Sequence, residues 1–221
     1  MRKIVGNIFQ SLDGVMQAPG GPSEDPTDGF THGGWQMGYS DNVAEAAIGE
    51  MLKPPFALLL GRRTYDIFAS YWPFVKGEEA AIGESFTKAD KHVLTHGNEP
   101  LEWENSHRLS GIAGLKSIKE GDGPDLRIWG SGSIYPGLIE AGLLDQLMLV
   151  TYPLVLGSGK RTFRDGTPAA ALKLGKHETG PSGALVTTFE PVGEIKTGEA
   201  NLAPPNEREE KRQKAMADGA W

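Results

Sequence analysis

The stretch Phe56-Ala57-Leu58-Leu59-Leu60-Gly61-Arg62-Arg63-Thr64 decides the fold class. Its first five residues form a continuous apolar run that is too short for most helices. The run is bounded by Pro54-Pro55 and by glycine, so it predicts a strand that is covered on both faces. Such a strand implies a sheet with helices on each side.

The residues that follow this strand suggest an anion site. Gly61 to Thr64 stand at the start of a helix predicted over 64–70. At the carboxyl edge of an α/β sheet, two guanidinium groups and a hydroxyl at a helix N-terminus can hold a phosphate by charge-assisted hydrogen bonds. The alternative interpretation is a pair of surface arginines.

Strands and helices alternate on both sides of this stretch. Extended segments are predicted over 3–12, 91–95, 126–129 and 146–156, and helices over 41–52, 112–120 and 133–141. The alternation favours an α/β sheet with mainly parallel strands. Segments 172–179 and 184–191 flank Gly180-Pro181-Ser182-Gly183 and predict a terminal antiparallel hairpin.

The apolar periodicity stops near residue 195. We therefore predict one domain over residues 1–195 and a charged tail over 196–221, either helical or disordered. The 221 residues contain no cysteine, which excludes disulfides, thiolate metal sites and cysteine nucleophiles. No His-Glu-x-x-His motif occurs, so no metal is expected.

Charge and hydropathy exclude other classes of partner. The net charge is −7 and no block of Lys and Arg occurs, which argues against nucleic acid. No run approaches the ~18 apolar residues of a membrane span, and the N-terminal residues do not fit a signal peptide. We expect a cytoplasmic protein that acts on a small molecule.

Two further segments are candidates for binding. The segment from Gln17 to Gly34 is rich in proline and glycine and predicts a long loop, which together with Trp35 suits a substrate lid. Gly130-Ser131-Gly132-Ser133 follows the strand over 126–129 and precedes a helix, so it predicts either an anion cradle or an ordinary tight turn. Gly157-Ser158-Gly159-Lys160-Arg161 lacks the magnesium-binding hydroxyl of a P-loop and is interpreted as a turn with two cations.

These motifs resemble the dihydrofolate reductase-like superfamily. Ser11-Leu12-Asp13-Gly14, Leu60 to Tyr65, Trp129 to Gly132 and Tyr152 to Gly159 occur in its order and spacing. The similarity is strongest to the branch of the riboflavin-biosynthesis (RibD C-terminal) reductase domain, and it covers about Lys3 to Pro191. It implies a three-layer α/β/α fold and an NADPH-dependent reductase.

The resemblance also implies roles for individual residues. Gly61 to Thr64 would hold the 2′-phosphate and pyrophosphate of NADPH, Thr95 and His96 would lie near the adenine ribose, and Gly130 to Ser133 would cover the pyrophosphate. The residues assigned to the cofactor are Gly61, Arg62, Arg63, Thr64, Thr95, His96, Gly130, Ser131, Gly132, Ser133 and Tyr135. Trp35, Lys160 and Arg161 are assigned to the substrate, the last two to a substrate phosphate if the substrate carries one.

Two carboxylates are candidates for proton transfer. Glu45 lies on the predicted helix before Gly61, at an offset similar to that of the buried carboxylate in dihydrofolate reductases, where burial would raise its pKa. The alternative places Glu45 on the surface in the first turn of the helix. Asp13 is the second candidate, although its turn with Gly14 is sufficient explanation for an aspartate there.

The leading prediction is hydride transfer from NADPH to a C=N or C=O group of a small heterocyclic substrate. The alternatives are the riboflavin-pathway 5-amino-6-(5-phosphoribosylamino)uracil reductase and a non-catalytic nucleotide- or pterin-binding protein. The apolar strand over 147–156 and the terminal hairpin would suit a homodimer.

Overall fold

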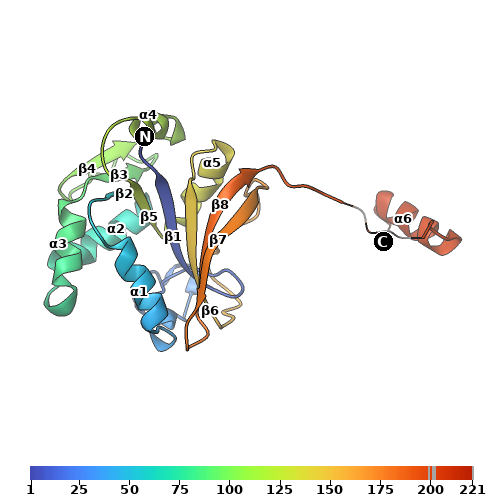
Figure 1. Cartoon of the computed structure of the whole chain (residues 1–221), viewed down its shortest axis with the longest axis horizontal. Coiled ribbons are helices and arrows are strands. Elements are labelled where there is room, and N and C mark those ends of the chain that lie inside the picture. Colours follow the sequence, from blue (N-terminus) through green and yellow to red (C-terminus); the bar gives the residue numbers. More distant parts are fainter. Residues whose placement is uncertain (199, 201–202, 221) are drawn as a thin grey trace.

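The computed structural model of the chain describes residues 1–198, 200 and 203–220. It contains one eight-stranded sheet with the order β4-β3-β2-β5-β1-β6-β8-β7 (Figure 1). The strands are β1 (Ile4–Ser11), β2 (Ala57–Gly61), β3 (Lys91–Leu94), β4 (Ser106–Leu109), β5 (Leu126–Trp129), β6 (Gln146–Tyr152), β7 (Ala171–Thr179) and β8 (Leu185–Gly193). The strands from β4 to β6 in this order are parallel, and β8 runs antiparallel to β6 and β7. The predicted mixed, mainly parallel sheet with a C-terminal antiparallel hairpin is confirmed.

Five helices cover the two faces of the sheet and complete the three layers. They are α1 (Asn42–Met51), α2 (Arg62–Tyr71), α3 (Ala80–Lys88), α4 (Ile112–Glu120) and α5 (Tyr135–Glu140). A further helix, α6 (Glu207–Ala217), follows the sheet. Buried side chains of α1, α2 and α3 belong to one hydrophobic cluster, and those of α4 and α5 to a second. The sheet separates these two cores.

Strand β2 shows how the sequence specifies this arrangement. Leu58 and Leu60 point into the first cluster and Ala57 and Leu59 into the second, and all four side chains are fully buried. Successive side chains of a strand point to opposite faces, so a continuous apolar run requires cover on both sides. Burial contributes roughly 1.5–3 kcal/mol for each leucine.

Two elements, α3 and β4, were not predicted from the sequence. Helix α3 has only nine residues and contains Gly83, which fits against the backbone carbonyl of Trp72. Strand β4 is one of the two edge strands, and its Ser106-His107-Arg108-Leu109 sequence has no apolar run. Short polar edge strands give little periodic signal.

Strand β6 is shorter than predicted. It ends at Tyr152, whereas the apolar pattern continues to Leu156. Pro153 follows directly and has no N–H for the sheet, and the N–H of Leu154 donates to the carbonyl of Tyr152 at 2.8 Å. The chain turns here and returns toward Asp13.

The segment after the sheet contains helix α6. Its N-terminus is capped by Asn206, whose side chain accepts hydrogen bonds from the N–H groups of Arg208 and Glu209. Figure 1 shows α6 apart from the sheet, and none of its residues is buried. Parts of the predicted tail (199, 201–202 and 221) lie outside the described residues. Among the described helices, none has an apolar stretch long enough to cross a membrane.

Candidate functional site

Two turns that are far apart in the sequence meet at the carboxyl ends of β2 and β5. The N–H of Gly61 donates to Ser131 Oγ at 3.0 Å, and the N–H of Ser131 donates to Thr64 Oγ1 at 3.2 Å. Ser131 Oγ in turn donates to the carbonyl of Trp129 at 3.1 Å. The structure thus joins the two segments that the sequence analysis assigned to one anion.

The second turn has an unusual backbone, in which the N–H groups of Gly130 and Ser131 donate to the carbonyl of Asn7 and to Thr64 Oγ1. Gly130 and Ser131 have φ values of 55° and 52°, in the left-handed region. Glycine adopts this region freely, and for Ser131 the hydrogen bonds on both sides offset the strain. A Cβ at Gly132 would lie 2.8 Å from Met16 Sδ, so the side chain of Met16 covers this turn.

The two arginines after Gly61 have different surroundings. Arg62 Nε lies 2.9 Å from both carboxylate oxygens of Asp66, and Nη1 donates to the carbonyl of Glu99 at 2.9 Å. The bond to Asp66 raises the pKa of Arg62. Arg63 is exposed and makes no hydrogen bond or ion pair with the part of the chain that the structure describes. Arg63 is therefore the cation that remains available to an anionic ligand.

The predicted adenosine-side residues lie on the loop after β3. Thr95 Oγ1 accepts a hydrogen bond from the N–H of Gly97 at 3.2 Å, and His96 is exposed. Arg108 donates to the carbonyls of Gly97 and Glu99, and the latter also accepts from Arg62. This shared carbonyl connects the loop to the start of α2, next to Arg63.

Tyr135 requires a correction. Its side chain is fully buried in the second cluster, on the face that α4 and α5 cover. A Cβ at Gly6 would lie 2.6 Å from the Tyr135 hydroxyl, so the ring packs directly on β1. Burial raises the pKa of this hydroxyl. The ring is a core residue and cannot contact a cofactor at the sheet edge.

Glu45 does not have the burial that a proton donor would need. It is exposed in the first turn of α1, the surface position that the alternative interpretation described. The carboxylate that makes contacts at this end of α1 is that of the capping residue Asp41. It accepts hydrogen bonds from the N–H groups of Val43 and Ala44, both at 3.0 Å. Asp41 also accepts from the Ser182 hydroxyl at 2.6 Å, which attaches the hairpin turn to α1.

Asp13 is held as an anion by its own chain. Burial alone would raise its pKa, but hydrogen bonds from the Ser11 hydroxyl and the N–H groups of Leu156 and Gly157 lower it to about 2. A carboxylate with this pKa is ionised at neutral pH and does not donate a proton. Asp13 thus connects the end of β1 to the segment after β6.

The three residues assigned to the substrate are engaged within the protein. Trp35 is 8% exposed, donates from Nε1 to the carbonyl of Gln17 at 2.8 Å and packs edge-to-face on Tyr152 at 5.7 Å. Lys160 and Arg161 form ion pairs with aspartates of the chain. The loop over 17–34 therefore lies against the turn that contains these two cations.

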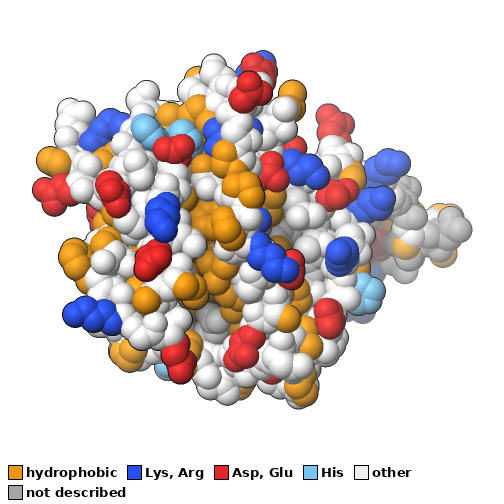
Figure 2. All heavy atoms as spheres, turned by 60° about the vertical axis from the view of Figure 1, so that its left-hand side comes forward, with side chains coloured by type: hydrophobic (Ala, Val, Ile, Leu, Met, Phe, Trp, Pro, Cys, Tyr) orange, Lys and Arg blue, Asp and Glu red, His pale blue; other side chains and the backbone are white. Residues whose placement is uncertain are grey.

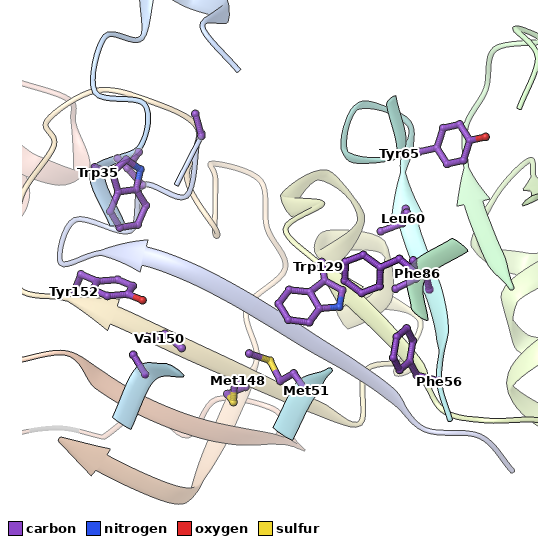
Figure 3. Close-up of a cluster of buried hydrophobic side chains, with 14 of the residues drawn as sticks. Trp35, Met51, Phe56, Leu60, Tyr65, Phe86, Trp129, Met148, Val150 and Tyr152 are labelled. Carbon is purple, nitrogen blue, oxygen red and sulfur yellow. The ribbon is translucent and has the colours of Figure 1, made fainter. Parts of the chain in front are cut away.

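Figure 3 shows the aromatic cluster between these segments. Trp35 and Tyr152 lie at one end and Tyr65 and Phe56 at the other, with Met148, Met51, Trp129 and Phe86 between them. On the surface, hydrophobic side chains line a hollow in the middle of the face in Figure 2, with charged groups on both sides. An apolar hollow with charged margins suits a planar organic ligand.

Three polar groups in this region were missed by the sequence analysis. Asn7 Oδ1, Trp129 Nε1 and the Tyr152 hydroxyl are buried without a hydrogen-bond partner among the described residues. Asn7 and Trp129 are paired in register on β1 and β5. An asparagine within an otherwise apolar strand was the available signal, because buried polar groups without partners are uncommon.

Comparisons with known proteins agree with this architecture. The family model described as the RibD C-terminal domain matches residues 2–186. The uncharacterized protein YyaP of Bacillus subtilis (strain 168) is 24% identical over 200 residues, which cover 85% of this chain and 94% of YyaP.

Two solved structures share the fold. A "Putative riboflavin biosynthesis protein" from Shewanella sp. PV-4 has a TM-score of 0.64 at 15% identity and covers 86% of this chain and 99% of its own. Dihydrofolate reductase from Enterococcus faecalis, complexed with NADP(H), has a TM-score of 0.50 at 15% identity, with 86% and 96% covered. The resemblance read from the motifs is thus confirmed at the level of fold and family, which supports a reductase-type function. The chain belongs to the RibD C-terminal domain family.

Proposed function

We propose that this protein is a cytoplasmic, NADPH-dependent reductase that transfers a hydride to a C=N or C=O carbon of a small heterocyclic substrate. The observation that carries the proposal is the contact of Gly61 and Thr64 with Ser131. This contact places two turns side by side at the carboxyl ends of the strands. A helix begins after each turn, and backbone N–H groups at the start of a helix favour an anion.

The residues at this edge fit a dinucleotide phosphate. Arg63 is exposed and its side chain has no partner among the described residues. In our proposal the turns over 61–64 and 130–133 bind the pyrophosphate, and Arg63 with His96 binds the 2′-phosphate. When bound, NADPH supplies the hydride.

The chain's own residues then orient the substrate and exclude water. The apolar cluster with Trp35, Trp129 and Tyr152 lowers the local polarity, which strengthens hydrogen bonds inside the site. In our proposal, a substrate that enters this cluster would meet Asn7 Oδ1 as an acceptor and Trp129 Nε1 and the Tyr152 hydroxyl as donors, all three of which are buried without a substrate. Burial raises the pKa of Tyr152 to about 12, so its hydroxyl stays protonated and donates at neutral pH.

A non-catalytic nucleotide- or pterin-binding protein is the second candidate. The observation that favours it is the state of the two carboxylates, because Glu45 is exposed and Asp13 is ionised. Neither offers a buried acid for protonating the product. The third candidate, the riboflavin-pathway 5-amino-6-(5-phosphoribosylamino)uracil reductase, requires a free site for a substrate phosphate.

The candidates are separated by following NADPH oxidation with purified protein. The expected result is substrate-dependent oxidation with at least one member of a panel of oxidised pterins, flavin precursors and cyclic imines. NADPH binding without any oxidation would support the non-catalytic candidate. Neither binding nor oxidation would contradict the proposal as a whole.

A homodimer also remains a proposal. Strands β7 and β8 form the free end of the sheet and expose Leu174, Leu185 and Val192, at 46%, 39% and 57%. Covering these side chains with a second copy would remove apolar surface from water. Sedimentation equilibrium distinguishes a dimer from a monomer.

A further inference from the structure

We infer that Lys160 and Asp25 determine the substrate class: their ion pair closes the position of a substrate phosphate, so this protein takes an unphosphorylated, uncharged ring compound. The inference rests on the proposed function and specifies its substrate. The family resemblance assigns Lys160 and Arg161 to a substrate phosphate, so the contacts of these two cations decide whether that position is open.

Three side chains of the loop contact the Lys160 ammonium. Nζ donates to Asp25 Oδ2 at 3.0 Å and to Thr27 Oγ1, and it forms an ion pair with Asp28 Oδ2 at 3.3 Å. Two of its three N–H donors are therefore used in hydrogen bonds, and a second carboxylate lies beside it. A phosphate would have to displace at least one carboxylate.

Asp25 and Thr27, two of the partners of Lys160, are held in place by Gln17. Gln17 Nε2 donates to the carbonyls of Asp25 and Thr27 at 2.9 and 3.0 Å, and Gln17 Oε1 accepts from the N–H of Lys160 at 2.9 Å. Gln17 is 3% exposed, and the side chain of Asp25 is 9% exposed. Asp25 is therefore the fixed partner of Lys160, whereas the side chain of Asp28 is 78% exposed.

Arg161 is engaged in the same way. Nε donates to the carbonyl of Asp13 at 2.9 Å, and Nη2 lies 3.4 Å from Asp13 Oδ2 and 3.2 Å from the carbonyl of Gly157. The carboxylate of Asp13 also accepts hydrogen bonds from the N–H groups of Leu156 and Gly157. Two cations therefore face the carboxylates of Asp13, Asp25 and Asp28, and the excess negative charge opposes a phosphate dianion.

The space beside this cluster suits a neutral group. A cavity of about 200 Å³ is lined by Gln17, Asp28, Phe30, Ser158, Gly159 and Lys160. Phe30 is 5% exposed, and its ring would lie 3.0 Å from a Cβ at Gly159, so one wall is aromatic and closely packed. A flat, uncharged ring can pack there without separating the ion pair.

The test measures phosphate binding directly and needs neither cofactor nor reduction. Calorimetric titrations compare ribose 5-phosphate with ribose on the wild-type protein and on the Asp25→Asn/Asp28→Asn variant. The control is Asp122→Asn/Asp165→Asn, which makes the same change of net charge at two exposed residues. Thermal melting with circular dichroism verifies that each variant is folded.

We expect the wild-type protein and the control to bind ribose 5-phosphate no more tightly than ribose. The Asp25→Asn/Asp28→Asn variant should gain at least tenfold in affinity for ribose 5-phosphate, and adding Lys160→Met should remove the gain. Two results would overturn the inference: tighter binding of ribose 5-phosphate than of ribose by the wild-type protein, with loss in Lys160→Met, or no gain in the folded double variant. Either result leaves NADPH binding and oxidation untouched, so failure here and failure of the proposed function are distinguishable.

Discussion

The backbone N–H of Gly61 donates to Ser131 Oγ at 3.0 Å, although the two residues are separated by 70 positions in the sequence. This bond connects the ends of β2 and β5, and the N–H of Ser131 in turn donates to Thr64 Oγ1. The hydroxyls of Ser131 and Thr64 therefore join the two glycine-containing turns.

Ser131→Ala should destabilise the protein and weaken NADPH binding. The change leaves the buried N–H of Gly61 without its acceptor, which costs about 1–3 kcal/mol. Urea unfolding measures the stability, and a fluorescence titration measures NADPH affinity. Ser133→Ala is the matched control for stability, because Ser133 is exposed and its hydroxyl has no partner among the described residues. Equal stability of the two variants would contradict the account of the turn.

Tyr135→Phe should leave NADPH affinity unchanged and keep or slightly raise the stability. The hydroxyl is buried without a partner among the described residues, so its removal relieves a desolvation cost of about 1 kcal/mol. Gly6→Ala should destabilise strongly, because its Cβ would lie 2.6 Å from the same hydroxyl. A selective loss of NADPH binding in Tyr135→Phe would restore the role that the sequence analysis gave this residue.

His92 should make the protein less stable as the pH falls. Burial, followed by the charges of Arg2 and His107, lowers the pKa of His92 from 6.5 to about 4. The folded state therefore binds this proton less readily than the unfolded state, and its stabilising contribution is present above pH 6.5 and lost between pH 6.5 and 4.

Urea unfolding between pH 7 and pH 4 measures this slope. His92→Gln should flatten it, whereas His177→Gln, at an exposed position of β7, should not. The same slope in the wild-type protein and His92→Gln would contradict the assignment.

Asp41→Ala should lower the free energy of unfolding by about 2–3 kcal/mol. Asp41 caps α1 through two backbone N–H groups and holds Ser182 of the hairpin turn, so both contacts are lost together. Asp122→Ala, at an exposed position, is the control for thermal and urea unfolding. Ser182→Ala separates the turn contact from the cap, and it should cost less than Asp41→Ala.

The sequence predicted those parts of the fold and site that depend on local pattern. The strand β2 and the glycine turn after β5 were both predicted correctly. Each depends on a pattern of neighbouring residues: an apolar run in the strand and glycines in the turn. The roles of Glu45, Tyr135 and Lys160 depend on which distant residue lies against each. Tyr135 packs against Gly6, and Lys160 pairs with Asp25. Both contacts join residues that are far apart in the sequence, so neighbouring residues do not predict them.

The ratio of the dissociation constants for NADH and NADPH tests the central claim most directly, measured by fluorescence titration on the wild-type protein and Arg63→Ala. Arg208→Ala, on the exposed helix α6, is the control. We predict that the wild-type protein and the control bind NADPH at least tenfold more tightly than NADH, and that Arg63→Ala loses this preference while its affinity for NADH changes little. Absence of NADPH binding by the wild-type protein, or an undiminished preference in Arg63→Ala, would contradict the account.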